Sequence, residues 1–114
     1  MEIEETREGT VVVLALSGQI DSSTAGQLED VLPACVQRAT CVVLDLASVP
    51  YISSAGLRVM LKSIKLAKGA GHTLVLAGLT PQVYEVFQVS GFASIFRMFS
   101  DRTDALAALS ETEA

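Results

Sequence analysis

Three short apolar runs constrain the fold more than any other feature of this sequence. They span Thr10 to Gly18, Cys41 to Val49 and Thr73 to Leu79, and each is rich in valine and leucine. Runs of this length and composition are typical of strands that are covered on both faces. A segment with helical spacing of apolar residues follows each run, and strands that alternate with helices pair in parallel through right-handed crossovers. The sequence therefore predicts an α/β fold.

The remaining segments complete a mixed, mostly parallel sheet of four to five strands with about four helices. Helices are expected from Ser22, where Ser22 to Thr24 offer N-cap hydroxyls, from Ser54 to Lys68, from Thr80-Pro81 to Gly91, and after the cap Asp101, with Leu106 and Leu109 facing inward. Two further strands are expected at Ile3 to Thr6, on an edge, and at Ser94 to Phe99. Pro33 is expected to bend the first helix or to end its first half.

Length and composition predict a single domain. The chain has 114 residues, of which 50% are hydrophobic and 18% are charged, as is typical of one ordered domain. We expect this domain to span residues 1–110 and residues 111–114 to form a short disordered tail. The free protein is expected to be a monomer or a weak dimer.

The charge and the segment lengths argue against nucleic-acid and membrane partners. The net charge is −5, whereas proteins that neutralise phosphate backbones carry clustered lysine and arginine. The first residues lack the pattern of a secretion signal, and no apolar run approaches the roughly 18 residues of a membrane-spanning helix. We therefore expect a cytoplasmic protein with no nucleic-acid and no membrane partner.

The sequence offers no residue set for a metal ion or a cofactor. Cys35 and Cys41 lack CxxC spacing, and His72 is the single histidine, so a zinc ion would lack ligands. The segment "GAGHTL" does not complete G-x-G-x-x-G and precedes a strand instead of opening a helix. We expect no cofactor, and we expect both thiols to be reduced and buried.

The turn "YISSAGL", residues 51–57, is the main candidate site. Folds of this class bind ligands and partners at the loops after the carboxyl ends of their strands; here these loops are Gly18 to Ser23, Ala47 to Gly56 and Gly78 to Pro81. Ser53 is predicted to cap the next helix through its hydroxyl. Ser54 then lies in the first turn, with its own hydroxyl in solvent beside unpaired N–H groups at the positive end of the helix dipole. Gly56 indicates that another group approaches closely: either a neighbouring strand of the protein itself, in a tight turn, or a partner.

A phosphate on Ser54 would act as a switch. It would bring roughly −1.5 to −2 charges to a helix start that stabilises anions, so the fold is expected to tolerate it. A partner docked over the same turn would face a desolvated dianion and is expected to be repelled.

An enzyme is the other function that the serines suggest. "SSAG" keeps half of the nucleophile elbow G-x-S-x-G, but Ile52 stands where the first glycine belongs. No Asp or Glu lies between Ser54 and His72, so the order Ser, acid, His of a hydrolase is not available. A hydrolase is therefore the least favoured of the functions that the sequence suggests.

The helix after the serines has a basic stripe, Arg58, Lys62 and Lys65. Such stripes are usually a solvated face, although this one would also steer an acidic partner towards Ser54. Tyr51 is expected to pack in the core rather than to contact a partner, and Met60 is expected to be a contact residue.

The segments "LSGQIDSSTAGQLE" and "VVLDLASVPYISSAGLRVML" resemble the first loop and the central motif of STAS domains, specifically of bacterial anti-sigma factor antagonists. The resemblance covers roughly Glu4 to Leu109 and implies a STAS-like fold. It implies a non-enzymatic cytoplasmic protein that binds an anti-sigma factor serine kinase and so frees a sigma factor. The kinase would end the binding by phosphorylating Ser54, and a serine phosphatase would restore it.

The resemblance also assigns roles to the neighbouring residues. Asp21 matches an acid of the first loop, while Ser53 replaces the aspartate that usually precedes the acceptor. The predicted docking surface consists of Asp21, Ser53, Ala55, Gly56, Arg58 and Met60. Because of Ser53, the alternative is an unphosphorylated STAS adaptor of a stress-signalling or lipid-transport complex, which docks constitutively or senses a small ligand.

Overall fold

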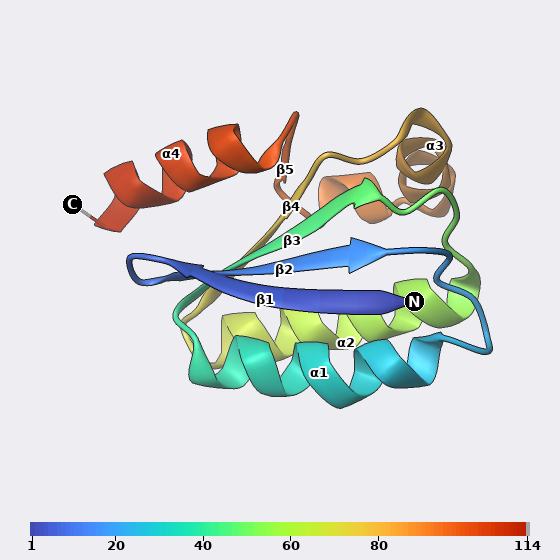
Figure 1. Ribbon diagram of the computed structural model, residues 1–114, viewed down its shortest axis with the longest axis horizontal. Helices are drawn as coiled ribbons and strands as arrows, with labels where there is room; N and C mark the ends of the chain where they lie inside the picture. Colours follow the sequence, from blue (N-terminus) through green and yellow to red (C-terminus); the bar gives the residue numbers. More distant parts are fainter. Residues whose placement is uncertain (114) are drawn as a thin grey trace.

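The chain folds into one five-stranded mixed sheet, with helices on both faces (Figure 1). The computed structural model describes the backbone of residues 1–113 and the side chains of residues 1–109. The strands are β1 (Glu2–Glu8), β2 (Val11–Ser17), β3 (Cys41–Ser48), β4 (Thr73–Ala77) and β5 (Met98–Phe99). They lie in the order β1-β2-β3-β4-β5, with β1 antiparallel to β2 and every other pair parallel. The predicted fold class is confirmed, including the edge strand at the N-terminus.

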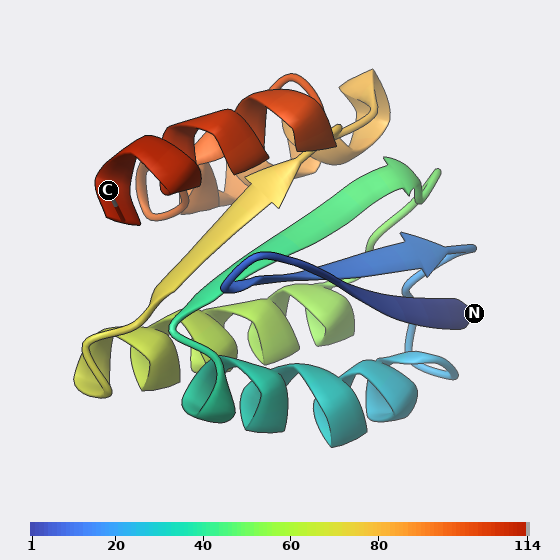
Figure 2. The same ribbon diagram turned by 60° about the vertical axis from the view of Figure 1, so that its left-hand side comes forward.

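Four α-helices connect and cover the strands. They are α1 (Ala25–Arg38), α2 (Ser54–Gly69), α3 (Pro81–Ser90) and α4 (Arg102–Glu113), with a 3₁₀ turn at Phe92–Ser94. Helices α1 and α2 lie side by side against one face of the sheet, and α4 lies across the opposite face (Figures 1 and 2). Helix α3 lies beyond the carboxyl end of β4 (Figure 1). All β-to-α loops therefore open at the same end of the sheet.

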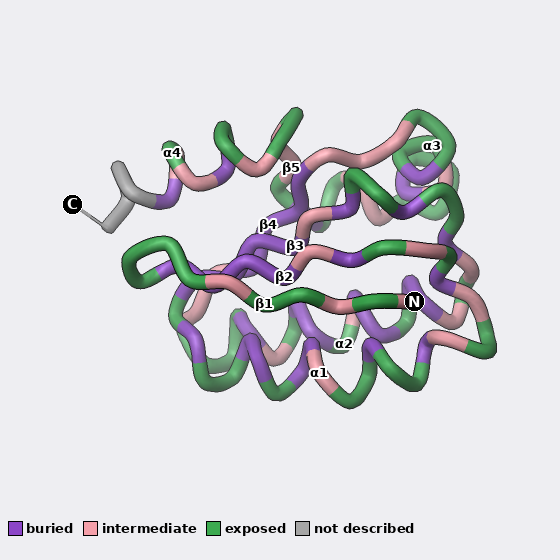
Figure 3. The backbone as a smooth tube through the Cα atoms, viewed as in Figure 1, coloured by how far each residue is buried: buried purple, intermediate pink, exposed green. Residues whose placement is uncertain are grey.

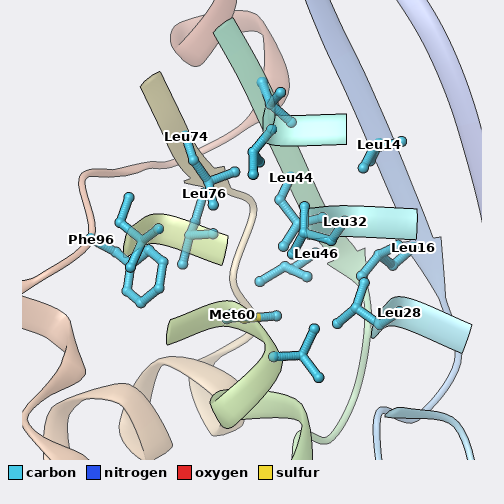
Figure 4. Close-up of a cluster of buried hydrophobic side chains, with 14 of the residues drawn as sticks. Leu14, Leu16, Leu28, Leu32, Leu44, Leu46, Met60, Leu74, Leu76 and Phe96 are labelled. Atoms are coloured by element: carbon cyan, nitrogen blue, oxygen red, sulfur yellow. The ribbon is translucent and has the colours of Figure 1, made fainter. Parts of the chain in front are cut away.

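The alternation of side chains along the strands divides the core into two layers. Leu14, Leu44 and Leu76 face α1 and α2 and belong to the larger cluster, part of which Figure 4 shows. Val13, Val43 and Val75 face the other way and pack with Ala105 and Leu109 of α4, among others. Because both faces are covered, β2, β3 and β4 are almost continuously buried (Figure 3). This explains why these strands read as uninterrupted apolar runs.

Three local predictions differ from the structure or lie outside it. Helix α1 continues through Pro33 to Arg38, so the proline does not end it; buried side chains on both sides of Pro33 hold the helix against the sheet. The last strand is only Met98–Phe99, because Phe96 turns into the core and the chain before it forms the 3₁₀ turn. The predicted disordered tail, 111–114, lies outside the residues whose side chains are described, and it stays a prediction.

Candidate functional site

The three predicted loops meet at the carboxyl end of the sheet. Beyond β2 and β3 the two chains stay paired through a bridge between Ile20 and Ile52. The N–H of Ile20 donates to the carbonyl of Tyr51 at 2.9 Å, and the N–H of Ser53 donates to the carbonyl of Ile20 at 2.8 Å. The third loop joins them because the Thr80 hydroxyl donates to the carbonyl of Val49 at 3.3 Å. The segment that leads into α2 is therefore held by backbone hydrogen bonds to the first loop and by a side-chain hydrogen bond from the third.

The two serines divide their tasks as the sequence predicts. Ser53 is the N-cap of α2, and its Oγ accepts a hydrogen bond from the N–H of Gly56 at 3.5 Å. Ser54 is the first residue of the helix, and its side chain is exposed. No acidic residue lies in the first turn of α2, so the positive end of the helix dipole next to Ser54 is not neutralised within that turn. The site thus presents a free hydroxyl in a positive local field.

Gly56 is required by packing inside the protein. A Cβ at this position would lie 2.5 Å from Cγ2 of Ile20 and 3.0 Å from Cγ1 of Ile52. These are side chains of the paired loops just described, so Gly56 is the point where α2 rests on the bridge between them. Of the two interpretations of this glycine, the contacts support close packing within the protein. Gly56 is buried and presents no surface for a partner.

The prediction that Met60 belongs to the docking surface is also wrong. Its side chain is fully buried, and Figure 4 shows it in the larger core cluster, between α2 and the sheet. The reason is helical spacing, because Leu57, Met60 and Ile64 lie three and four residues apart and share the core face of α2. The same spacing in the sequence is the signal that would have placed Met60 in the core.

Tyr51 is exposed rather than packed in the core. About half of its surface, 49%, is accessible, because the extended segment before α2 alternates and places Ile52 inward instead. The prediction of a core tyrosine was therefore wrong. Sequence reasoning also missed Tyr84, which is 42% exposed and lies one turn after the cap Thr80 of α3.

Asp21 has a local structural task that the sequence did not reveal. Its Oδ1 accepts hydrogen bonds from the N–H and the hydroxyl of Ser23, at 2.9 and 2.6 Å, and from the N–H of Thr24 at 3.2 Å. These bonds, above all the one from the Ser23 hydroxyl, lower the pKa of Asp21 below its usual value. Thr24 is the N-cap of α1 but makes no side-chain cap bond, so the carboxylate of Asp21 orders this turn instead of the predicted hydroxyl caps. Asp21 and Ser53 each directly follow a residue of the bridge between Ile20 and Ile52.

The basic stripe on α2 is partly neutralised. Lys62 Nζ lies 3.1 Å from Oε1 of Glu29 on α1, whereas Arg58 and Lys65 have no carboxylate partner among the residues whose side chains are described. The stripe lines a shallow hollow of about 410 Å³ together with Leu61 and other residues of α2. Arg58 lies one helical turn from Ser54, so it is the cation of the stripe that is placed nearest to the candidate site.

A serine hydrolase centre is not assembled. Ser54 begins α2, which has 16 residues and is about 24 Å long at 1.5 Å per residue. His72 follows the far end of that helix, and its Nδ1 lies 2.9 Å from the carbonyl oxygen of Val36. The single histidine therefore cannot act as a base for Ser54.

The remaining features of the described residues concern metal ions, thiols and membranes. These residues hold no group of three or more His, Cys, Asp or Glu side chains that is arranged to bind a metal ion. Cys35 and Cys41 are buried and are not joined by a disulfide, as predicted, and burial raises the pKa of the Cys35 thiol. None of the described helices is both long enough and apolar enough to span a membrane.

Comparisons with known proteins agree with this arrangement. The model of the STAS domain family matches residues 2–105. BtrV of Bordetella bronchiseptica, a candidate anti-sigma factor antagonist, is 46% identical over 99 residues, which are 86% of this chain and 85% of BtrV. MlaB of Escherichia coli, a binding protein of an intermembrane phospholipid transport system, is 35% identical over 71 residues, 62% of this chain and 71% of MlaB. The crystal structure of an anti-sigma factor antagonist from Mycobacterium paratuberculosis superimposes with a TM-score of 0.86 at 25% identity and covers 94% of this chain and 92% of that one.

Proposed function

Because the chain belongs to the STAS domain family, we propose that it is an anti-sigma factor antagonist whose docking to an anti-sigma serine kinase ends when Ser54 is phosphorylated. The observation that carries this proposal is the exposed Ser54 hydroxyl at the first position of α2, directly after Ser53 has taken the capping task. The relative BtrV, which bears the name of such an antagonist, supports the same class. The partner is then an anti-sigma factor with kinase activity that uses ATP, and a serine phosphatase reverses the reaction.

The electrostatics of the turn make phosphorylation tolerable to the fold. A phosphoserine at the first helical position places its dianion next to N–H groups that have no partner within the helix. The cap bond from Gly56 to Ser53 does not involve the Ser54 hydroxyl, so it is kept. Phosphorylation therefore leaves the domain folded and changes only what its surface offers to a partner.

The docking surface follows from the exposed residues around Ser54. Arg58 on the next turn and Tyr51 before the helix are both exposed, and Ala55 is half-buried. Asp21 and Ser53 border the turn from the neighbouring loop and from the cap. Exposed aromatic and arginine side chains are the types that contribute most to protein interfaces, so Tyr51 takes the place that Met60 was predicted to hold.

Binding of the kinase tests the proposal. We expect Ser54→Asp to weaken the affinity tenfold or more, measured by calorimetry. The thermal unfolding midpoint is expected to stay within about 2 °C of wild type, since surface changes of this kind alter stability by only about 0.5 kcal/mol. Ser94→Asp is the matched control, because it adds the same charge at an exposed serine outside the three loops. Wild-type affinity of Ser54→Asp, or equal weakening by Ser94→Asp, would refute the switch.

The phosphorylation step has its own test. Incubation with the kinase and ATP is expected to add one phosphate, and this addition is expected to be lost in Ser54→Ala and kept in Ser53→Ala. A phosphate that persists in Ser54→Ala would place the acceptor elsewhere.

A constitutive adaptor is the second candidate function. It is favoured by Ser53 in the place where the family usually has an aspartate and by the likeness to MlaB, a binding protein of a transport system. For an adaptor we expect no phosphate transfer by any cognate kinase and no effect of Ser54→Asp on partner binding. The same two experiments therefore separate both functions.

A further inference from the structure

A second site lies at the opposite end of the molecule, where β4 and the chain before β5 diverge. β5 pairs only with Leu76 and Ala77 of β4, and the first bond between the segments runs from the N–H of Leu76 to the carbonyl of Arg97 at 3.0 Å. Before this point the two chains separate and leave a hollow of about 200 Å³. Three basic residues line it: Lys68 from the end of α2, His72 and Arg97. From this convergence we propose that the hollow binds a small dianion of the phosphate class.

The three basic side chains are available to a ligand. Neither Lys68 nor Arg97 pairs with a carboxylate among the residues whose side chains are described. The guanidinium of Arg97 rests on the ring of Phe99, 4.9 Å from its centroid. Such stacking uses the flat face of the guanidinium and leaves its N–H donors free along the edge. On a chain with a net charge of −5, unpaired cations around one hollow create a local positive field.

The ring of His72 is held in place at the edge of the same hollow. Its Nδ1 lies 2.9 Å from the carbonyl oxygen of Val36, and because a carbonyl only accepts, Nδ1 carries the hydrogen. The other ring nitrogen, Nε2, is left for the hollow that His72 lines.

The backbone contributes a donor, and three carbonyls at the end of α2 are already hydrogen-bonded. The N–H of Thr73 donates to Thr40 beside β3 at 2.8 Å, so by alternation the N–H of Leu74 turns to the opposite side, towards the hollow that Leu74 lines. The carbonyls at the end of α2 would repel an anion, but those of Leu66, Ala67 and Lys68 accept hydrogen bonds from Ala70, Gly71 and His72.

Charge and size select the ligand class. Lys68 and Arg97 supply two permanent positive charges, which match a dianion better than a monovalent carboxylate. The volume is below the roughly 300 Å³ at which pockets for drug-sized molecules begin. Ile64 and Ile95 give the hollow an apolar part of its lining, against which the organic part of a phosphate monoester can rest. Free phosphate and a small phosphate monoester share the chemistry that this site recognises.

A titration followed by amide NMR spectra tests the site. Sodium phosphate, added at constant ionic strength against sodium chloride, is expected to shift the amide signals of residues 73–75 in a saturable way. We expect Lys68→Gln and Arg97→Gln to weaken this binding tenfold or more, while Lys65→Gln, one turn earlier on α2 and outside this hollow, stays within twofold of wild type. Dispersed amide spectra of all three variants confirm that they are folded.

The outcomes decide the proposal and the source of the ligand. Shifts that never saturate, that chloride reproduces, or that Lys65→Gln weakens as much would overturn it. Acetate binding as tightly as phosphate would overturn the dianion class. Tighter binding of glycerol phosphate than of free phosphate supports the site with a monoester as ligand, and the reverse order supports it with the free ion. None of these outcomes depends on Ser54 or on a kinase.

Discussion

Replacing Gly56 by alanine tests the packing that holds the start of α2. The new Cβ would lie 2.5 Å from Cγ2 of Ile20, well inside van der Waals contact, so one of the two segments must move. Ile20 cannot turn away easily, because it is β-branched and because its N–H and its carbonyl are both hydrogen-bonded to the neighbouring segment, at Tyr51 and Ser53. Overpacking of this kind costs about 1–3 kcal/mol.

The difference in helix propensity between glycine and alanine acts in the opposite direction. Alanine is better than glycine inside a helix by about 1 kcal/mol, which offsets part of the overpacking cost of Gly56→Ala. We therefore expect a net loss of about 0–2 kcal/mol in the free energy of unfolding. Gly26→Ala in the first turn of α1 is the matched control, because a Cβ there meets nothing within 4 Å. It is expected to gain up to about 1 kcal/mol.

Urea denaturation of the two variants measures this difference. The expected result is that Gly26→Ala is the more stable of the two, by about 0.5–3 kcal/mol. The amide signals of residues 20–24 are expected to move in Gly56→Ala, because the displaced Ile20 belongs to that loop. If Gly56→Ala stabilises the protein as much as Gly26→Ala does and leaves these signals in place, the contact between α2 and Ile20 is refuted.

Three further predictions concern the same region. Ser53→Ala is expected to cost about 1 kcal/mol in urea denaturation through loss of the cap, whereas Ser54→Ala stays within about 0.5 kcal/mol; equal losses would mean that Ser53 is not the cap. Met60→Ala is expected to lower the free energy of unfolding by about 2–5 kcal/mol. An unchanged free energy of unfolding would contradict the burial of Met60. The pKa of Asp21 is lowered in the folded protein, so its contribution to stability is present above the usual value of 3.8 and is lost as the pH falls through the lower folded pKa. When the pH is lowered below 3.8, the free energy of unfolding should therefore fall less in Asp21→Asn than in the wild type. Parallel curves of unfolding free energy against pH for the two proteins would contradict this.

Part of the site could be predicted because its chemistry is local. A serine directly before a helical pattern caps it, and the next residue then lies in the first turn, whatever the rest of the chain does. The same holds for Thr80-Pro81 and for Gly91, which end up at the start and the end of α3. Local sequence cannot give the neighbours of such a residue across the fold. For Asp21, the hydrogen-bond partners depend on how the loop turns back on itself.

The sequence by itself determined the type and order of the elements, because the spacing of apolar residues and the residues at turns act over a few positions. It also determined which of two adjacent serines is exposed. Only the tertiary structure decided that Gly56 is needed where α2 meets Ile20, that Tyr51 is exposed, and that Lys68, His72 and Arg97 line one hollow. These outcomes depend on contacts between segments that are distant in the chain or on the exact orientation of a loop, and no periodicity within one segment encodes them.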